Sequence, residues 1–542
     1  YLRLLGFKDA SFIKIRNISL DNWIERNIEY TLVDAESQFS IDFAGMKFSP
    51  AELDALQPKF ERAAREMGRI EAGEIKNPDE KRKVTHFSDR KVYPQSELFA
   101  SVEAFAEQVR SGKITGETGR KFEAVVVNGI GGSALGPQLM QFAINGPYWN
   151  EKTDAARNGY LKLYFLDNTD SAEFADLSEV MDPETTLHLV ISKSGGTQET
   201  KNNMIAMEEL YAARKLSFPK HAAAITMKGS ELDRHARGSN WLAVFEMAES
   251  IGGRTSETSI VGHVPAALTG VKFGRFLEGA CRMDEWTRTA DPRKNPAMML
   301  AAMWYIAGEG KGNRNMVIVP YSDRLILLSR YMQQLVMESL GKELDLDGRV
   351  VHQGLNVFGN KGGTDAHAFI QQLNDGRDDF FATFIEVLKD AEKLPITDST
   401  DMGTYLHGFL EGLSAALRGK GRQIITIRVP QVSELELGML IALYERAVAI
   451  YAEFININAF HQPGVQSYKL AAKGVLALRE KVMAKLAELG GITGTAIEIA
   501  EKAGCPDDAV EVGALLDKAA VNCPAVSRKF CEKSNQWVYT VK

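Results

Sequence analysis

The sequence predicts an α/β protein with two successive α/β units, each built on a parallel sheet. Short β-branched runs alternate with helix-length amphipathic segments twice along the chain, first from about residue 124 and again from about residue 315. Such alternation is typical of doubly wound sheets whose two faces are covered by helices. The length of 542 residues independently favours at least two large units, because single cores usually stop growing at about 250–300 residues.

The first 115 residues are predicted to form a helical N-terminal arm. Apolar residues recur at helical spacing over 51–72 and again over 97–111. Neither segment carries a pattern of chemically active side chains. We therefore expect no functional site in this arm.

The first α/β unit is expected over residues 116–290. Its predicted strands are 124–128, 163–167, 187–192 and 222–227, and its predicted helices lie near 134–144, 171–181, 198–214 and 230–237. The second unit is expected over residues 291–490. Its predicted strands begin with the run after Asn315 and continue at 379–387 and 423–429, with helices at 323–340, 364–374, 403–417, 433–456 and 464–488.

Residues 491–542 are predicted to form a small C-terminal appendix that resembles a winged helix. Helical stretches at 495–503 and 512–519 precede two strand-like runs, 526–530 and 536–541, around a polar turn. The charge of this segment is balanced and no basic helix stands out, so a packed arm is favoured over a nucleic-acid binder.

Composition excludes several classes of protein. The chain is 45% hydrophobic and 25% charged, with a net charge of −7 and no long block of like charge, which argues against disorder and against a polyanionic partner. Four cysteines without a C-x-x-C pair favour a reducing cytoplasm. No run of 18 apolar residues occurs and residues 1–6 lack the layout of a signal peptide, so we expect no membrane span and no leader.

A glycine-rich motif, GIGGSALG at 129–136, follows the first predicted strand and enters a helix. Its glycines would let backbone N–H groups approach an anion at the helix N-terminus, and Ser133 would add a hydroxyl donor. The same motif also passes as a loose dinucleotide fingerprint, with Asp167 at the end of the next strand as the ribose-binding acid. A nucleotide site is therefore a rival interpretation.

A second motif, SKSGGTQET at 192–200, again joins a strand to a helix. It holds four hydroxyl side chains, which is more than a helix cap needs, since one serine or threonine suffices. The surplus of donors indicates a bound phosphate. Because a dinucleotide fold has no use for a second hydroxyl-rich loop, this motif favours a small phosphorylated molecule.

At this point the sequence resembles the glucose-6-phosphate isomerase family, from the lead-in to about residue 485. The matching blocks are GIGGSALGP (129–137), SKSGGTQET (192–200), GGRTS (252–256), MESLGK (337–342), GTDAHAF (363–369) and FHQPGVQSYK (460–469). The resemblance implies two sugar isomerase domains of flavodoxin-like topology, flanked by helical arms. It also implies a homodimer with an active site completed by the second subunit.

The resemblance further implies a role for each matching residue. Glu338 matches the proton-transfer base and Arg254 the arginine beside the reacting carbons, while His367 and Lys469 match the pair linked to ring opening, with His367 reaching in from the neighbouring subunit. The residues that match substrate contacts are Gly132, Ser133, Ser192, Lys193, Ser194, Thr197, Thr200 and Gln462. No cofactor and no metal are expected, since the histidines show no metal-ligand spacing.

The chemistry needs these residue types independently of the resemblance. A carboxylate such as Glu338 can move a proton between neighbouring carbons, and a permanently charged guanidinium such as Arg254 stabilises the cis-enediolate left behind. Closed sugar rings first need an acid–base pair to open them, and His367 and Lys469 can divide that task. The sequence does not assign the donor between these two.

Two departures from the family pattern keep alternatives open. Thr255 follows the arginine Arg254 at a position where family members usually have an aromatic residue. An enzyme that also accepts mannose 6-phosphate is therefore one alternative. In the phosphate loop, Gly195-Gly196 replaces a bulkier pair. A sugar-phosphate sensor with a binding appendix is a second alternative. It is disfavoured because a pure binder needs neither a base nor a ring-opening pair.

Overall fold

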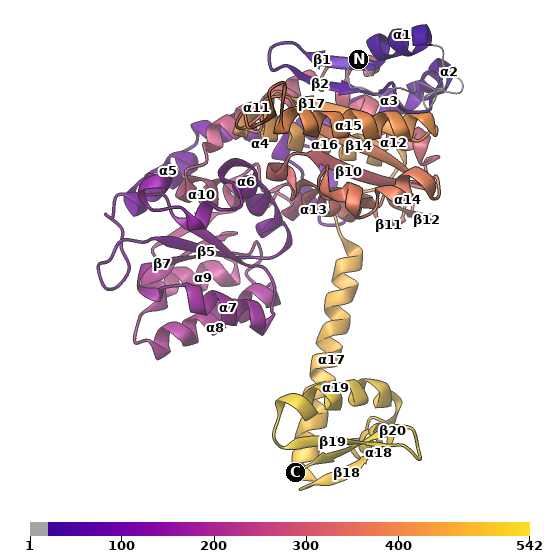
Figure 1. Ribbon diagram of the computed structural model, residues 1–542. Coiled ribbons are helices and arrows are strands. Elements are labelled where there is room, and N and C mark those ends of the chain that lie inside the picture. Colours follow the sequence, from indigo (N-terminus) through magenta and orange to yellow (C-terminus); the bar gives the residue numbers. More distant parts are fainter. Residues whose placement is uncertain (1–19) are drawn as a thin grey trace. The chain divides into compact units, whose positions relative to one another are not determined.

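The computed structural model describes residues 20–542 and contains two compact units, which divide between His461 and Gln462 (Figure 1). The start of the chain, to which the expectation of no leader refers, lies outside the described residues. Among the described helices, none is long and apolar enough to cross a membrane. Each unit is described separately below.

The first unit contains a five-stranded parallel sheet with the order β6-β5-β7-β8-β9. Numbered along the chain, this is the order 2-1-3-4-5 of flavodoxin-like folds, so the predicted fold class is confirmed here. The strands are β5 (Ala124–Asn128), β6 (Lys162–Leu166), β7 (Thr186–Ile191), β8 (Ala222–Thr226) and β9 (Ala243–Glu246). Four of them lie within one residue of the predicted ranges, and β9 had not been predicted.

Both faces of this sheet are buried, which explains its continuous apolar strands. Val125 and Val127 of β5 face a core shared with α5 (Glu97–Arg110) and α10 (Ile260–Thr269). Val126 between them faces the opposite core, shared with α7 (Ser171–Val180), α8 (Gln198–Ala213) and α9 (Glu231–Gly238). Figure 1 shows α7, α8 and α9 together on one side of the sheet. The remaining helix after β5 is α6 (Leu135–Asn145).

A second sheet of the same unit has six strands in the order β1-β2-β17-β14-β10-β13. Its parallel strands are β10 (Asn315–Tyr321), β13 (Val357–Phe358), β14 (Phe380–Val387) and β17 (Gln423–Val429). These four repeat the order 2-1-3-4 of the first sheet. Where a fifth parallel strand would follow, an antiparallel hairpin of β1 (Thr31–Asp34) and β2 (Phe39–Asp42) takes its place.

The lead-in is therefore helical only in part. Its helices are α1 (Leu20–Tyr30), α2 (Pro50–Ala55), α3 (Gln57–Glu71), α4 (His86–Val92) and α5. Periodicity did not indicate β1 and β2, because each strand has only four residues and the alternation of exposed and buried side chains is incomplete. The pairing of β2 with β17 comes from the tertiary structure.

The second sheet packs on a core built around long buried helices. α16 (Glu434–Phe454) is buried over nearly its whole length and packs on α11 (Phe273–Trp286) and α12 (Pro296–Ala307). The remaining elements of this unit are α13 (Leu328–Met332), the π-helical segment η11 (Gln333–Glu338), α14 (Ile370–Asp375), α15 (Met402–Gly419), and the short hairpins β3 (Ile75–Asn77) with β4 (Arg82–Lys83), β11 (Lys342–Leu344) with β12 (Val350–Gln353), and β15 (Pro395–Thr397) with β16 (Thr400–Asp401).

The second unit has its own small core. It consists of α17 (Pro463–Glu488), β18 (Ile492–Thr495), α18 (Ala496–Lys502), α19 (Ala509–Asn522), β19 (Val526–Cys531) and β20 (Gln536–Val541). The three strands form an antiparallel sheet in the order β18-β20-β19, and side chains of α17, α18 and α19 cover it. A helix, a strand, two helices and a hairpin follow one another, which is the element order of winged-helix domains.

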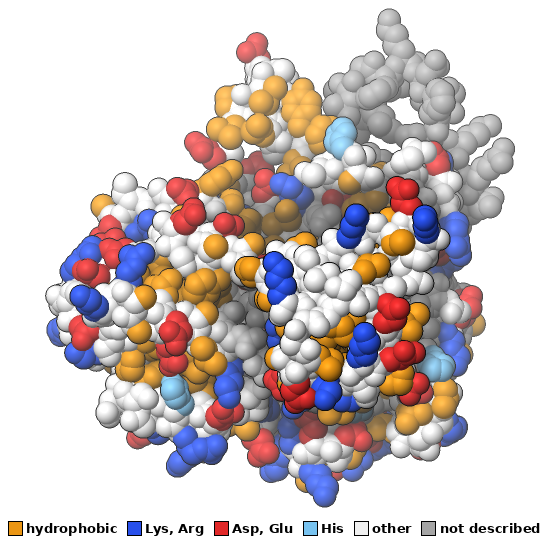
Figure 2. All heavy atoms as spheres, turned by 90° about the horizontal axis from the view of Figure 1, so that it is seen from below, with side chains coloured by type: hydrophobic (Ala, Val, Ile, Leu, Met, Phe, Trp, Pro, Cys, Tyr) orange, Lys and Arg blue, Asp and Glu red, His pale blue; other side chains and the backbone are white. Residues whose placement is uncertain are grey.

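Charges of both signs are spread over the surface. Figure 2 shows acidic and basic side chains interspersed on the face drawn, without a large area of one sign. This distribution agrees with the modest net charge of −7. The absence of a nucleic-acid partner stays a prediction.

Candidate active site

The two predicted anion loops lie side by side at the switch point of the first sheet. β5 and β7 are neighbours in the sheet but not in the chain, and the glycine motif follows β5 while the hydroxyl-rich motif follows β7. Ligands of open α/β sheets bind at the carboxyl ends of strands where the strand order reverses. The topology therefore brings both motifs to the expected binding edge.

The rival nucleotide interpretation gains no support from Asp167. Its carboxylate accepts a hydrogen bond of 2.7 Å from Gln138 Nε2 on α6 and lies 3.9 Å from Arg330. The Asp167 carboxylate is thus already paired with side chains of this protein. The residue that had been considered for a ribose thus ties α6 to the strand end.

The hydroxyl-rich loop is organised by its own side chains. Ser192 Oγ donates to Thr197 Oγ1 at 3.1 Å and accepts from the N–H of Gly195, while Ser194 Oγ accepts from the N–H of Gly196. Gly195 has a φ of +74°, and a Cβ there would lie 2.4 Å from the backbone nitrogen of Leu232. The glycine that departs from the family pattern is thus required where this loop passes the start of α9.

Thr200 and Ser133 lie close to the same edge. Thr200 is buried at the first turn of α8, and its Oγ1 has no hydrogen-bond partner among the described residues. Ser133 ends the short helical turn after β5 and is half-buried. The predicted phosphate contacts Ser133, Ser192, Ser194, Thr197 and Thr200 therefore come from two adjacent loops.

Lys193 connects the phosphate loop to the segment that precedes Arg254. Its Nζ donates to the carbonyl oxygens of Glu249 at 2.6 Å and Ile251 at 2.7 Å. Burial, with a smaller contribution from the nearby Arg82, lowers the pKa of Lys193 to about 8. In this structure the ammonium holds the chain that leads to Arg254.

Gly132 lets the loop after β5 pack directly on the turn that carries Arg254. A Cβ at Gly132 would lie 1.9 Å from the carbonyl oxygen of Gly253, a distance that no side chain tolerates. Ser256 Oγ also donates to the carbonyl oxygens of Gly253 at 2.7 Å and Gly132 at 3.3 Å. The backbone of Gly132 therefore positions the arginine turn.

Arg254 and Glu338 face each other from the two α/β halves of the first unit. Arg254 Nε lies 3.5 Å from Glu338 Oε2, and Arg254 Nη1 donates to Ser339 Oγ and to the carbonyl oxygen of Ala459, both at 3.2 Å. Arg254 is only 6% exposed. Burial lowers the pKa of its guanidinium, and the Glu338 carboxylate acts in the opposite direction.

Glu338 ends the π-helical segment η11. Its side chain remains 23% exposed, whereas that of Arg254 is 7% exposed. Single π-helical turns next to α-helices frequently occur at functional sites. A partly accessible carboxylate beside a buried, fixed guanidinium suits a base whose product is an oxyanion.

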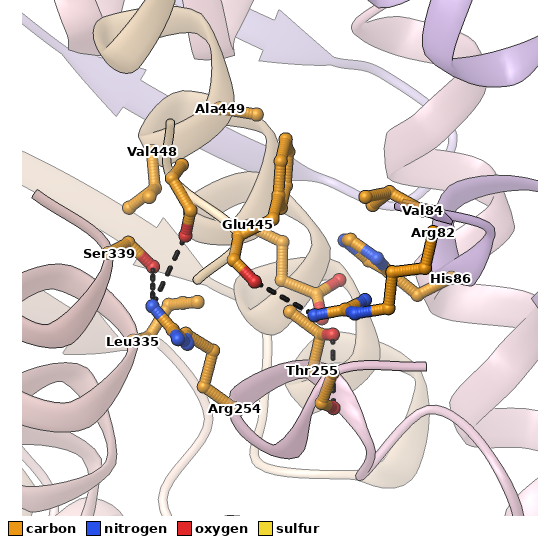
Figure 3. A pocket seen from close by; sticks show the side chains of 13 residues that line it. Arg82, Val84, His86, Arg254, Thr255, Leu335, Ser339, Glu445, Val448 and Ala449 are labelled. Atoms are coloured by element: carbon orange, nitrogen blue, oxygen red, sulfur yellow. Dashed lines mark hydrogen bonds between the residues drawn. The ribbon is translucent and has the colours of Figure 1, made fainter. Parts of the chain in front are cut away.

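A small cavity lies behind Arg254 (Figure 3). About 20 Å³ of it is open, which is room for about one water molecule. Its polar lining includes Arg82, His86, Thr255, Ser339 and Glu445. Thr255, which stands where the family usually has an aromatic residue, therefore lines this cavity.

Glu257, two residues after Thr255, is buried beside Glu445 of α16. Glu257 is 1% exposed and accepts a hydrogen bond from the hydroxyl of Tyr331. Burial raises the pKa of Glu257 well above its usual range, and the neighbouring Glu445 acts in the same direction. Arg90, in turn, donates to Glu445 at 2.6 Å and makes a bidentate pair with Asp284. Buried polar side chains therefore form a connected network next to the turn that carries Arg254.

The ring-opening residues are placed only in part. His367 lies exposed at the end of a short 3-10 turn (Thr364–His367) of the first unit. Lys469 is exposed on α17 of the second unit, to which Gln462 also belongs. The roles of these three residues stay predictions.

Within the described part of the chain, one cluster has the composition of a metal site. Ligand atoms of Glu386, His407 and Glu411 lie within 4.8 Å of one another. Arg428 lies 2.8 Å from Glu386 and 3.7 Å from Glu411, so a guanidinium already compensates these carboxylates. The expectation of a metal-free enzyme stays a prediction.

Sequence reasoning missed several side chains around Arg254 and Glu338. Ser339 and Lys342 lie in the MESLGK block but had no assigned role, and His86 and Glu445 lie far away in sequence. Helical spacing gives no signal for Lys342, because the helical segment ends before it and Lys342 begins β11. No local signal exists for His86 or Glu445.

Comparisons with known proteins agree with this geometry. Residues 67–425 match the family model described as phosphoglucose isomerase. The glucose-6-phosphate isomerase of Geobacter sulfurreducens is 46% identical over 512 residues, which cover 92% of this chain and 95% of that protein. The enzyme of the same name from Acaryochloris marina is 46% identical over 496 residues, covering 89% of this chain and 92% of that protein.

Solved structures lead to the same family. The crystal structure of a glucose-6-phosphate isomerase from Chlamydia trachomatis is similar with a TM-score of 0.75 and 28% identity, covering 84% of this chain and 91% of that chain. A hypothetical protein from Thermus thermophilus is similar with a TM-score of 0.68 and 25% identity, covering 81% of this chain and 100% of that chain. The chain therefore belongs to the phosphoglucose isomerase family of aldose–ketose isomerases.

Proposed function

We propose that the protein interconverts glucose 6-phosphate and fructose 6-phosphate, with Glu338 as the base that moves the proton. The carrying observation is the contact of 3.5 Å between Arg254 Nε and Glu338 Oε2, beside two anion loops at the switch point of the sheet. A base, a fixed cation and a phosphate cradle are the parts that this reaction needs. The names of the relatives support the substrate.

The phosphate binds first in this mechanism. Hydroxyls of Ser133, Ser192, Ser194, Thr197 and Thr200 are grouped at the ends of β5 and β7, and the start of α8 directs its backbone N–H groups to the same place. The sugar is thereby oriented by its phosphate. Remote binding energy of this kind positions the reacting carbons.

The proton transfer follows at carbons 1 and 2. Glu338 removes the proton beside the carbonyl, which leaves a cis-enediolate, and returns the proton to the neighbouring carbon. Arg254 stabilises the negative charge that develops on the enediolate. Its hydrogen bonds to Ser339 and Ala459 support this role, because a guanidinium fixed in advance needs little reorganisation during the reaction.

Ring opening precedes this step and completes the proposal. His367 and Lys469 share the acid–base work, Gln462 contacts the sugar, and His367 comes from the second subunit of a homodimer. The exposure of His367 supports an intermolecular role, because a side chain that acts on a neighbouring subunit must lie at the surface of its own.

A coupled assay tests the proposal directly. Fructose 6-phosphate is supplied with EDTA present, glucose 6-phosphate is detected, and Glu338→Gln is compared with Glu343→Gln, an exposed glutamate five residues further on. We expect Glu338→Gln to lower kcat by about 10²–10⁴-fold, the usual contribution of a general base, and Glu343→Gln to match the wild type.

Each other outcome has a defined meaning. An active Glu338→Gln variant would show that the base is misassigned. Absence of wild-type turnover both with EDTA and in a parallel arm without EDTA would favour the sugar-phosphate sensor. Turnover only in the arm without EDTA would contradict metal-independent catalysis. Turnover of mannose 6-phosphate in a parallel arm would identify the broader isomerase.

A further inference from the structure

Lys342 is a buried lysine without an acidic partner. Lys342 is only 4% exposed. Within residues 20–542, no carboxylate oxygen lies within 4.0 Å of its ammonium nitrogen. Burying a cation in this way costs free energy that a neutral residue would not cost. Such an arrangement suggests a functional role.

The ammonium holds the end of the segment that carries Glu338. Lys342 Nζ donates to the carbonyl oxygen of Glu338 at 2.7 Å and to that of Ser339 at 2.8 Å. These carbonyls lie at the C-terminal end of a helical segment, where hydrogen bonds are missing and a positive charge is favourable. Lys342 therefore fixes the backbone from which the Glu338 carboxylate projects.

The same lysine is electrostatically part of the site. Three charged or titratable groups face it: Arg254 from η8 (Gly253–Thr255), Glu338 from η11, and His461 from the segment after α16. Burial, with a smaller contribution from Arg254, lowers the pKa of Lys342 to about 7, and Glu338 acts in the opposite direction. Its charge thus changes near neutrality, within reach of the base.

We propose that Lys342 is the positioning residue of Glu338: its ammonium fixes the carbonyl end of η11 and places a second positive charge beside the Glu338–Arg254 pair. The inference rests on the proposed function, because it assigns Lys342 an effect on the base of that reaction. Lys342 touches no reacting atom. Its effect passes through the Glu338 backbone and through the local field.

The test compares three variants by kcat, KM and pH profile with fructose 6-phosphate, together with thermal unfolding. Lys342→Met removes the ammonium at similar length, and Lys342→Arg keeps the charge. Lys59→Met is the matched control, because Lys59 Nζ also donates to a carbonyl at the end of a helix, that of Phe454, whereas Lys342 donates to the carbonyls of Glu338 and Ser339.

We expect Lys342→Met to lower kcat about 10–100-fold, the range that small displacements of a catalytic group produce, with KM changed less than about threefold. The decrease in log kcat should be smaller for Lys342→Arg than for Lys342→Met, by at least one third of the decrease seen in Lys342→Met. The wild-type kcat should also decline as pH rises through about 7, where Lys342 loses its proton. This decline should be absent in Lys342→Met and displaced upward in Lys342→Arg.

Two results would overturn the inference. One is a kcat of Lys342→Met within twofold of the wild type. The other is a loss of kcat no greater than in Lys59→Met at equal loss of stability, with an unchanged pH profile. If Lys342→Met does not fold, the profiles of the wild type and Lys342→Arg decide, since identical profiles contradict the proposal.

The assay also separates this inference from the proposed function. An active wild type, an inactive Glu338→Gln and a fully active Lys342→Met would remove only the role of Lys342. An inactive wild type, or an active Glu338→Gln, would remove the proposed function and this inference with it.

Discussion

His86 is a buried histidine whose two ring nitrogens have no hydrogen-bond partner among the described residues. It is 2% exposed and lies against the cavity behind Arg254. Burial lowers its pKa well below the usual range, and the nearby arginines Arg90, Arg446 and Arg82 act in the same direction. The ring is therefore neutral in the folded protein.

This neutral ring makes the protein sensitive to acid. Below about pH 6.5 the unfolded chain binds a proton at His86 and the folded chain does not, so the free energy of unfolding falls by about 1.4 kcal/mol per pH unit from this group. We expect His86→Leu to reduce the loss of stability between pH 7 and pH 5, as measured by urea denaturation.

The comparison at pH 8 serves as the internal control. There His86 is neutral in both states, so any difference between wild type and variant reflects packing alone. Equal pH slopes for the two proteins between pH 7 and pH 5 would show that the buried ring is not the source of acid sensitivity.

At the scale of elements, two backbone features position the site. Gly132 lets the turn after β5 touch the turn of Arg254, and the π-helical segment η11 aims Glu338 at that turn. Gly132 acts through its backbone alone, whereas η11 carries the Glu338 side chain at its end. Both decide the distance between base and guanidinium.

Gly132→Ala tests the first feature. The added Cβ would lie 1.9 Å from the carbonyl oxygen of Gly253, so the two turns must separate. We expect the free energy of unfolding to fall by about 1–3 kcal/mol, as in other overpacked sites, and kcat/KM to fall more than about tenfold because Arg254 moves. Urea denaturation and the coupled assay measure the two effects.

Gly68→Ala is the control for this substitution. Gly68 lies inside α3, and a Cβ there meets nothing within 4 Å, so alanine should raise stability by about 0.5–1 kcal/mol with unchanged kcat/KM. A Gly132→Ala protein with wild-type kcat/KM would show that the contact of the two turns does not position Arg254.

At the scale of the whole molecule, the proposed homodimer predicts complementation between two inactive variants. Glu338→Gln and His367→Ala are each expected to be inactive. If His367 acts in the neighbouring subunit, a hybrid dimer has one site with both defects and one intact site. Random exchange of subunits should then restore about one quarter of wild-type activity.

The measurement is the coupled assay after mild denaturation and refolding of the two variants together. Refolding each variant alone is the control for recovery of the fold. A mixture that remains inactive, with hybrid dimers demonstrated by differential tags, would mean that His367 serves the subunit to which it belongs.

Local sequence patterns were enough to predict the α/β class and most of the elements. The predicted strands 124–128 and 536–541 coincide with β5 and β20, because continuous or alternating apolar runs bounded by turns have few other uses. The motifs at 129–136 and 192–200 likewise predict an anion site, since glycines and hydroxyls in strand-to-helix loops have a local physical reason. Six matching blocks indicated the family.

Contacts between segments that are distant in sequence could not be predicted from local patterns. The short strand β2 pairs with the open edge of β17, and β1 pairs with β2. No local periodicity encodes such partners. Likewise, Arg254 meets Glu338 across 84 residues of chain, and His86, Glu445 and Lys342 gain their altered pKa values from burial that the fold creates. Burial and long-range contact are properties of the packed chain, so local sequence patterns reveal candidate residues but not their distances or protonation.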